Sequence, residues 1–361
     1  MTLDTARAVV SAGGRSLVAS LGGRLEGELA AGGGALVRLP VHSRNPLVIA
    51  DNARRLARLI REQGVSLVHV RSRAPAFSAL WAAKAAGVPV LATYHGIYQT
   101  RSRLKRWYNA VMTRGDLTIA NSLFTRDHIV AEHGLTGDRI AVAPEGIDTD
   151  LFDPARVSPA RVAALRAAWG LEAGDERPVL LLAARLTGWK GQRTMIAAMG
   201  RLKQAPDAVL ILAGKAEKPG EAQALRTLAQ QIGVSDRVRL VGAVDDMPAA
   251  FALADLVVAP STLPESFGRG VVEAGAMERP VLASPLGGPG ETVADGQTGW
   301  LAPAGDPAAW AAAVDTALSL TPQARARIGK AARERVIALY SLQAMSTATF
   351  AIYRRVLESR R

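Results

Sequence analysis

Short apolar segments alternate with longer Ala-, Leu- and Arg-rich segments along the whole chain, and this alternation restricts the fold more than any other feature. The apolar segments lack polar residues at alternate positions, so each is predicted to be a strand buried on both faces. The intervening segments, such as 52–63 and 220–232, carry apolar residues at helical spacing. The pattern therefore predicts an α/β protein with doubly wound parallel sheets.

The predicted strands form two series, which indicates two domains. The first series is 15–20, 35–39, 67–70, 88–94, 117–120 and 140–143, and the second is 179–184, 208–213, 238–241, 256–259, 281–284 and 299–301. Asp153-Pro154, Ser158-Pro159 and the polar segment 172–178 interrupt the pattern between them. We expect domains at 1–160 and 174–340, with a final helix within 341–361 that crosses back to the first domain.

Composition excludes several classes of protein. The 361 residues include no Cys, so disulfides, thiolate nucleophiles and Cys-based metal sites are absent, as is common in a reducing cytoplasm. No apolar run reaches the roughly 18 residues of a membrane-spanning helix, and the N-terminus lacks the pattern of a signal peptide. We therefore expect a cytoplasmic protein.

The densest motif is Pro264-Glu265-Ser266-Phe267-Gly268-Arg269-Gly270-Val271-Val272-Glu273-Ala274, between a predicted strand and a helix. This position is the carboxyl edge of a sheet, where open α/β folds bind ligands. Its glycines permit close approach of the backbone, and amides at a helix start bind anions such as a diphosphate. Glu265 and Glu273 can accept hydrogen bonds from sugar and ribose hydroxyls.

A second motif, Arg185-Leu186-Thr187-Gly188-Trp189-Lys190-Gly191, follows the strand predicted at 179–184. Two cations at one strand end can converge on a diphosphate, Arg as a planar fork and Lys as a point charge. A solvated pair of surface cations is the alternative for this motif alone.

Together these motifs resemble the retaining glycosyltransferases of family 4 (glycosyl transferases group 1), which have the GT-B architecture of two Rossmann-like domains facing across a cleft. The resemblance also includes Pro144-Glu145-Gly146-Ile147-Asp148, Gly287-Gly288 with Glu291, and Asp295-Gly296. It covers nearly the whole chain.

The resemblance implies a nucleotide-sugar donor, a UDP-, GDP- or ADP-sugar, bound mainly by the C-terminal domain and no further cofactor. Arg185 and Lys190 would hold the diphosphate, and backbone amides of Ser266, Phe267 and Gly268 would assist them. Glu273 would bind the ribose. Glu265 and His95, the latter in Tyr94-His95-Gly96, would contact the donor sugar as catalytic residues.

Other candidate ligand residues are given structural interpretations. Asp148-Thr149-Asp150 has a D-x-D form that holds metal in another class of glycosyltransferase, but cations and a helix start make a metal unnecessary here. His42, His69, His128 and His133 are expected to be structural or solvated. No metal site is predicted.

The resemblance departs from the family at the N-terminus. Members begin with a strand and a glycine-rich loop, whereas residues 1–6 already have the pattern of the first helix. We expect a gap in the N-terminal sheet, with exposed strand edges and apolar side chains. A start upstream of Met1 or an impaired protein would explain the departure.

Positive charge is concentrated in one segment. Residues 53–115 carry twelve of the Lys and Arg residues and a single acid, Glu62, and therefore +11 of the net charge of +12. Within it, Arg101, Arg103, Lys105, Arg106 and Trp107 place cations beside an aromatic ring, a composition that suits anionic lipid headgroups. A solvated basic face is the alternative.

The leading hypothesis is a metal-independent, retaining glycosyltransferase that acts on a hydroxyl of a lipid-linked or lipopolysaccharide-type acceptor, the acceptor being implied by the resemblance. It would lie on the inner face of the cytoplasmic membrane. A GT-B sugar-nucleotide epimerase and a non-catalytic sugar-nucleotide binding protein are the alternatives. A nucleic-acid partner is suggested by charge alone and is not expected.

Overall fold

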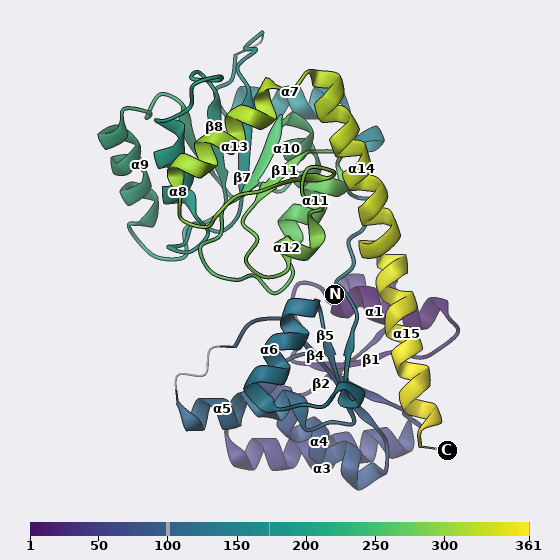
Figure 1. The fold of residues 1–361 in the computed structure, drawn as a ribbon. Coiled ribbons are helices and arrows are strands. Elements are labelled where there is room, and N and C mark those ends of the chain that lie inside the picture. The colour runs from purple at the N-terminus through teal and green to yellow at the C-terminus, as the bar shows by residue number, and fades with distance from the viewer. Residues whose placement is uncertain (99–101, 173, 361) are drawn as a thin grey trace. The chain divides into compact units, whose positions relative to one another are not determined.

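The computed structural model describes residues 1–98, 102–172 and 174–360, which form two compact units. The first unit is Met1–Gly146 together with Leu342–Arg361, of which Arg361 is not described, and the second is Ile147–Ser341. Each unit is built on parallel strands with helices packed against them (Figure 1). The two units are described separately below.

The first unit contains a four-stranded sheet of order β3-β4-β5-β6 and a separate two-stranded sheet, β1-β2. All of these pairs are parallel. The strands are β1 (Leu17–Ser20), β2 (Ala35–Arg38), β3 (Val68–Val70), β4 (Val90–Tyr94), β5 (Leu117–Ala120) and β6 (Ile140–Val142). Strands β4 and β5 are buried at every position, as expected for central strands covered on both faces.

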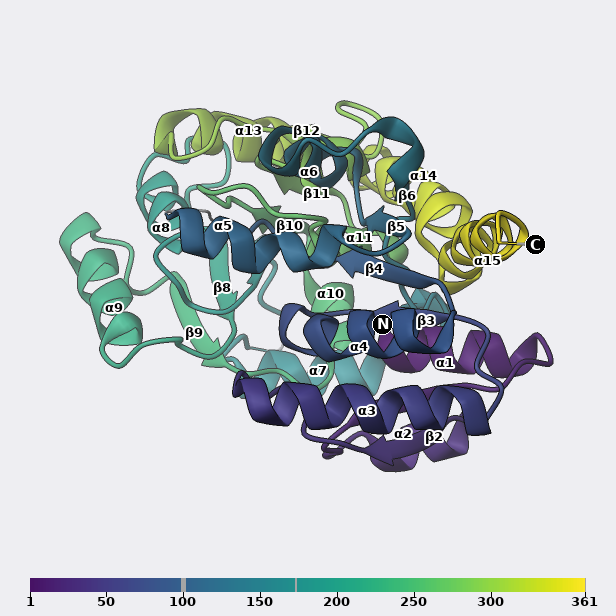
Figure 2. The ribbon, with the colours of Figure 1, turned by 90° about the horizontal axis from the view of Figure 1, so that it is seen from below.

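The helices of this unit flank its strands, and α3 and α4 lie side by side (Figure 2). They are α1 (Thr2–Ser11), α2 (Glu26–Ala31), α3 (Pro46–Glu62), α4 (Arg73–Ala86), α5 (Arg103–Asn109), α6 (Leu123–His133) and α15 (Leu342–Glu358), with 3₁₀ turns at Ala110–Thr113 and Gly137–Arg139. The Asn45 side chain caps α3 by accepting from the Leu47 amide, and Pro46 occupies the first turn, where its missing amide proton costs nothing.

The edges of β1 and β3 line a common cavity of about 600 Å³. Residues 17–22 and residues 67–72 all contribute to its wall. Consecutive side chains of a strand point to opposite faces of the sheet. Because every residue of these two segments lines the cavity, the cavity lies along the edges of the strands rather than on one face. Within the described part of the chain, β1 pairs with β2 and β3 with β4, and no strand lies between them. The gap expected in the N-terminal sheet corresponds to this position.

The second unit contains one parallel sheet of order β12-β11-β10-β7-β8-β9. Its strands are β7 (Val179–Ala183), β8 (Val209–Ala213), β9 (Val238–Gly242), β10 (Leu256–Ala259), β11 (Val281–Ala283) and β12 (Gly299–Leu301). Side chains on one face of β7, such as Leu181, pack in a cluster with Phe251, and those on the other face, such as Leu182, pack in a cluster with Trp310. The sheet is therefore covered on both faces, as the two-sided apolar strands predict.

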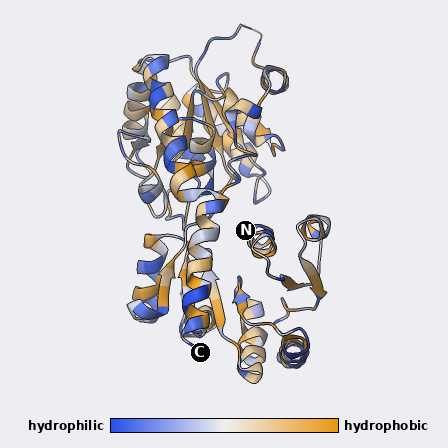
Figure 3. Cartoon of the chain, turned by 90° about the vertical axis from the view of Figure 1, so that its right-hand side faces the viewer, coloured by the Kyte–Doolittle hydropathy of each residue, from blue (hydrophilic) through white to orange (hydrophobic). Residues whose placement is uncertain are grey.

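The helices of the second unit include the long helix α14 (Pro322–Tyr340) near the end of the chain. They are α7 (Pro159–Ala168), α8 (Gln192–Met199), α9 (Glu221–Ile232), α10 (Met247–Leu253), α11 (Arg269–Ala276), α12 (Pro289–Thr292), α13 (Pro307–Ser319) and α14 (Pro322–Tyr340), with a 3₁₀ turn at Pro154–Arg156. The strands are mostly hydrophobic, and polar residues gather on the outer faces of the helices (Figure 3).

Helix α15 belongs to the first unit, although it follows the second unit in sequence. Ile352 and Val356 pack on Leu91, Leu117 and the neighbouring apolar side chains of the four-stranded sheet. The hydroxyl of Tyr353 lies 2.7 Å from Nδ1 of His69 on β3. The chain therefore returns to its first unit through this helix.

The predicted fold class is confirmed: the protein has two Rossmann-like α/β units with parallel sheets. Contacts divide the chain after Gly146, whereas the sequence pattern suggested a boundary at 160. Residues 147–160 lie with the second unit because Ile147 is fully buried in its core and Phe152 packs on Phe251, with ring centroids 6.1 Å apart. No helix of the described residues has the length and hydrophobicity required to cross a membrane.

Candidate active site

The loops that follow β7 and β10 meet at the carboxyl edge of the six-stranded sheet. These two strands are neighbours, so their loops begin side by side. Gly191 ends the first loop with φ of +76°, and a Cβ atom there would lie 1.9 Å from the carbonyl oxygen of Pro260 in the second. Only glycine permits this approach. The two predicted donor motifs are thereby held together.

Lys190, Glu265 and Gly268 line one small cavity between these loops, with a volume of about 40 Å³. Nζ of Lys190 lies 2.8 Å from Oε1 of Glu265, and both side chains are more than four-fifths buried. Ser261 donates a hydrogen bond from its hydroxyl to the same carboxylate oxygen. Lys190 also lies over the Trp189 ring, 4.5 Å from its centroid. The site therefore brings together a cation and a carboxylate predicted to bind different parts of one donor.

The glycine-containing motif adopts the expected turn into a helix. Gly268 is the N-cap of α11 with φ of +85°, and a Cβ atom there would lie 2.8 Å from Pro289. Phe267 is buried, and its ring packs edge-on against Tyr340 at 5.6 Å. The buried side chain of Phe267 therefore anchors the loop. The backbone of Phe267 lies at the start of α11, directly before Gly268.

The loop carrying Glu265 is also fixed from the opposite side. The amide of Gly288 donates to the carbonyl of Glu265 at 2.8 Å. A Cβ atom at Gly287 would lie 2.1 Å from that carbonyl oxygen, and Gly287 has φ of +83°. The second glycine pair of the sequence therefore supports the backbone of the first motif.

Glu273 and Arg185 have other partners. Glu273 lies one turn inside α11 and forms an ion pair with Arg269 at 3.2 Å. Arg185 is exposed and forms an ion pair with Glu217 at 2.9 Å. The structure thus places Arg185 and Lys190 on the same loop, but it pairs each with a different carboxylate.

His95 lies in the first unit, directly after β4. Its Nδ1 is 3.1 Å from Oε1 of Glu145, and the His95 side chain retains 23% exposure. A second small cavity, of about 10 Å³ and lying within the first unit, is lined by His95, Glu145, Asn121, Arg71 and His69 among others. Burial lowers the pKa of the Arg71 guanidinium. The negative charge of the Glu145 carboxylate raises this pKa and so partly offsets the effect of burial.

The basic aromatic segment forms helix α5. Arg103, Lys105 and Arg106 are exposed, and Arg106 lies 3.5 Å from Glu132. Trp107 is 53% exposed and Leu104 is 75% exposed, unusual values for large apolar side chains. Arg101 lies outside the described residues.

The D-x-D segment forms a turn. Oδ1 of Asp148 accepts from the amides of Asp150 and Leu151 at 3.0 and 2.9 Å. Asp150 lies 3.7 Å from Arg156. Among the described residues, no group of three or more His, Asp or Glu side chains is arranged to hold a metal ion.

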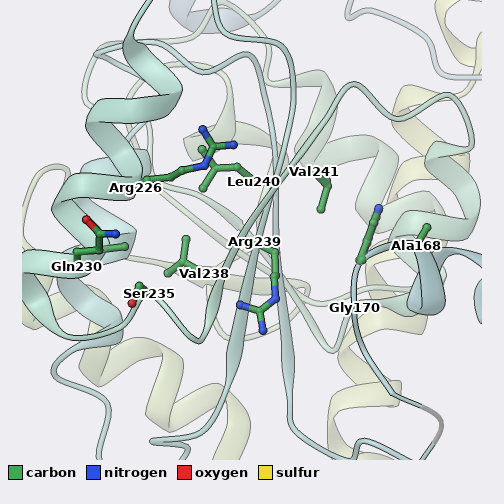
Figure 4. Close-up of a pocket in the computed structure, with 11 residues that line it drawn as sticks. Ala168, Gly170, Arg226, Gln230, Ser235, Val238, Arg239, Leu240 and Val241 are labelled. Atoms are coloured by element: carbon green, nitrogen blue, oxygen red, sulfur yellow. The ribbon is translucent and has the colours of Figure 1, made fainter.

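A larger cavity of the second unit lies away from these loops, along the edge of β9. It has a volume of about 760 Å³ and shares no lining residue with the cavity of Lys190 and Glu265. Figure 4 shows Arg226 and Gln230 of α9 and Arg239 of β9 around it. Its position along a strand edge, rather than at strand ends, separates it from the predicted donor site.

Some site residues were not predicted from the sequence. Ser261 is two residues beyond β10, and Asn121 directly follows β5, so their positions at strand ends could have indicated both. Glu145 was recognised within Pro144-Glu145-Gly146 without a role. Glu217 comes from the segment after β8, and nothing in its local sequence indicates a pair with Arg185.

Comparison with known proteins extends over the whole chain. Residues 167–335 match the family described as Glycosyl transferases group 1, and residues 1–151 match Glycosyltransferase Family 4. The crystal structure of a glycosyltransferase from Rickettsia africae ESF-5 is 29% identical with a TM-score of 0.90, and the match covers 99% of this chain and 94% of that one. The fold and the matched regions together are those of the GT-B class of glycosyltransferases.

A curated relative narrows the class. D-inositol 3-phosphate glycosyltransferase of Mycobacterium tuberculosis (strain H37Rv) is 34% identical over 251 residues, which are 68% of this chain and 50% of that protein. The chain belongs to glycosyltransferase family 4, as its motifs suggested. It spans about half the length of the curated relatives it matches.

Another solved structure shows the same fold with a ligand. HepE of Anabaena, in complex with UDP-glucose, is 23% identical with a TM-score of 0.82. The match covers 98% of this chain and 94% of HepE.

Proposed function

We propose that this glycosyltransferase transfers a sugar, with retention of configuration, from a nucleotide-sugar donor to a hydroxyl of a lipid-linked or lipopolysaccharide-type acceptor. The observation that carries the donor part is the shared cavity of Lys190, Glu265 and Gly268 at the carboxyl edge of the six-stranded sheet. A cation and a helix start suit a diphosphate, and a carboxylate suits sugar hydroxyls. The UDP-glucose bound to HepE supports a donor of this kind.

In this proposal the protein stabilises the leaving diphosphate electrostatically. Lys190 and Arg185 supply positive charge, and the backbone amides from Ser266 to Gly268 add hydrogen bonds at the start of α11. Such preorganised donors stabilise charge that develops in the transition state. Transfer is then independent of a metal ion, and activity should survive a chelator.

Two carboxylates divide the recognition of the donor. Glu273 binds the ribose and Glu265 orients the sugar, and His95 also contacts the sugar. Lys190 lies between the group that orients the sugar and the diphosphate: it contacts Glu265 in this structure, and it would contact the diphosphate in the complex.

The acceptor part of the proposal is supported by helix α5. Its exposed Leu104 and Trp107 stand among exposed cations, a combination that favours an anionic lipid surface. The enzyme would then act from the cytoplasmic side of the membrane, where a lipid-borne hydroxyl is within reach.

The test compares Glu273→Ala with Glu265→Gln, after thermal-shift screening of UDP-, GDP- and ADP-sugars identifies the donor. Glu273→Ala should weaken binding of the free nucleotide in calorimetry. Glu265→Gln should retain nucleotide affinity yet slow sugar transfer, because its carboxylate serves the sugar. Full activity in both variants would refute the assignment, and donor binding without transfer or hydrolysis would indicate a binding protein instead.

A further inference from the structure

Three polar side chains from three adjacent strands converge in the first unit. His95 follows β4, Asn121 follows β5, and Glu145 lies three residues beyond β6. These strands are parallel neighbours, so their carboxyl ends meet at one edge of the sheet. The topology, rather than local sequence, brings the three residues together.

One oxygen atom receives two of their contacts. Oε1 of Glu145 accepts from Nδ2 of Asn121 at 3.0 Å and lies 3.1 Å from Nδ1 of His95. An ionised carboxylate can only accept hydrogen bonds, so a short contact with Nδ1 places the proton on that nitrogen. A neutral imidazole with a proton on Nδ1 has an acceptor at Nε2.

The burial of the three side chains differs in a way that indicates their roles. Asn121 is fully buried, Glu145 is 7% exposed, and the side chain of His95 retains 23% exposure. A buried carboxylate is costly unless it is hydrogen-bonded, and here the amide, the imidazole and the nearby Arg71 compensate it. Asn121 and Glu145 are thus fixed in the interior, and His95, which Glu145 contacts, is the most accessible of the three.

We propose that Glu145 is a positioning residue for sugar transfer: together with Asn121 it holds His95 in the Nδ1-protonated tautomer, with Nε2 as an acceptor for a hydroxyl of the donor sugar. This inference rests on the proposed function, in which His95 contacts the sugar. Glu145 itself touches no substrate. A histidine with the other tautomer would donate from Nε2 and would meet the same hydroxyl with a different geometry.

The first experiment reads the tautomer directly. Two-bond ¹H–¹⁵N spectra of protein labelled in its five histidines distinguish the two ring nitrogens, and the His95→Gln variant assigns the signals. We expect the Nδ1-protonated form in the wild type and its loss in Glu145→Gln, because an amide side chain can donate as well as accept. A wild-type His95 protonated on Nε2, or an unchanged spectrum in the variant, would overturn the proposal.

The second experiment separates positioning from folding. Glu145→Gln should lower kcat for sugar transfer about ten- to hundredfold with little change in nucleotide affinity, and Asn121→Ala should have a smaller effect in the same direction. Thr118→Val is the matched control, because Thr118 is a buried β5 residue whose hydroxyl donates to the Met112 carbonyl and contacts none of the three. Its loss of stability should leave kcat and the His95 spectrum unchanged.

Failure of this inference can be told from failure of the proposed function. If His95→Gln retains full transfer activity, the role of His95 toward the sugar is wrong, whatever its tautomer. If His95→Gln loses activity while Glu145→Gln and Glu145→Asp both retain it, Glu145 does not position the histidine. Should Glu145→Gln fold poorly, Asn121→Ala and Glu145→Asp still provide both measurements.

Discussion

His69 shows how a single side chain links the final helix to the sheet. Its Nδ1 lies 2.7 Å from the hydroxyl of Tyr353 on α15, and its Nε2 lies 2.6 Å from the hydroxyl of Thr93 on β4. Burial, together with the nearby charge of Arg71, holds the pKa of His69 well below its usual value. Burial also raises the pKa of Tyr353 to about 12, so its hydroxyl keeps its proton. His69 is therefore neutral in the folded protein.

This depressed pKa predicts acid sensitivity. In the unfolded chain His69 binds a proton near pH 6.5, whereas in the folded protein it does so only at lower pH, so stability should fall as the pH falls below that value. The loss should approach about 1.4 kcal/mol per pH unit for this one group. His69→Gln, which retains hydrogen-bonding capacity, should be less stable at pH 8 but should lose less stability on acidification.

The measurement is the free energy of unfolding by denaturant at pH 8, 6 and 5 for both proteins. His128 and His133 also have lowered pKa values because of burial, but they are present in both proteins, so the difference between the slopes reports His69. Parallel pH curves for the two proteins would mean that His69 is not held neutral by the fold.

A second prediction for a single residue concerns the nucleotide affinity of Lys190 variants. Lys190→Ala should weaken a nucleoside diphosphate about ten- to hundredfold and the monophosphate much less, because one charge-assisted contact contributes about 1.5–3 kcal/mol. Arg193→Ala is the control, because Arg193 lies three residues away in α8 and pairs with Glu221 at 3.3 Å. Equal losses for the two nucleotides in calorimetry would place Lys190 away from the terminal phosphate.

Residue types at strand ends could be predicted from the sequence, but their partners could not. Lys190 and Glu265 were expected at one sheet edge, and they lie 2.8 Å apart. That contact depends on the adjacency of β7 and β10, which no local pattern specifies. The same limit explains why Arg185 was assigned to a diphosphate, while its contact with Glu217 became visible only in the structure.

At the scale of elements, the predicted strands agree with β1 to β12 because most are apolar on both faces and bounded by turn residues. Ends were less certain: the helix expected at 52–63 begins at Pro46, since Asn45 provides its cap. Strand order was not predictable, because it is decided by packing between segments far apart in the chain.

Helix α5 supports a prediction about membranes. Replacing Arg103, Lys105 and Arg106 with Ser should weaken binding to vesicles that contain phosphatidylglycerol or cardiolipin on the order of 100-fold, since each charge near the surface contributes about 1 kcal/mol. Added salt should weaken wild-type binding, because screening shortens the range of these interactions. Neutral vesicles should bind neither protein.

The control variant removes the same charge elsewhere. Arg201, Lys203 and Lys218 are exposed cations of the second unit, and replacing them with Ser should leave vesicle binding nearly unchanged. Both variants should bind nucleotide like the wild type. If sedimentation shows equal losses for the two variants, net charge rather than α5 determines binding.

At the scale of the whole molecule, the N-terminal strands are divided into two sheets. The family resemblance predicted a gap in this sheet. Strands β1 and β3 each have an edge on the cavity of about 600 Å³, whose wall includes Val18, Val68 and other apolar side chains. A strand placed in this gap would bury these apolar side chains and would form hydrogen bonds with the backbone edges of β1 and β3. Completion of the sheet is therefore expected to stabilise this unit more than any change within the existing strands.

The last prediction adds a strand at this position. A segment of about five Val and Ile residues, joined through a short turn to Met1, should pair with β1 and β3 and fill the cavity. Burying five such side chains contributes about 10 kcal/mol and ordering them costs about 7 kcal/mol, so a net gain on the order of 3 kcal/mol is expected. A Gly- and Ser-rich segment of equal length is the matched control, since it can extend but has little apolar surface to bury. Hydrogen exchange of the amides in β1 and β3 measures the outcome residue by residue: protection should rise with the apolar segment alone. Equal protection in the two proteins would show that the edges of β1 and β3 do not accept a strand.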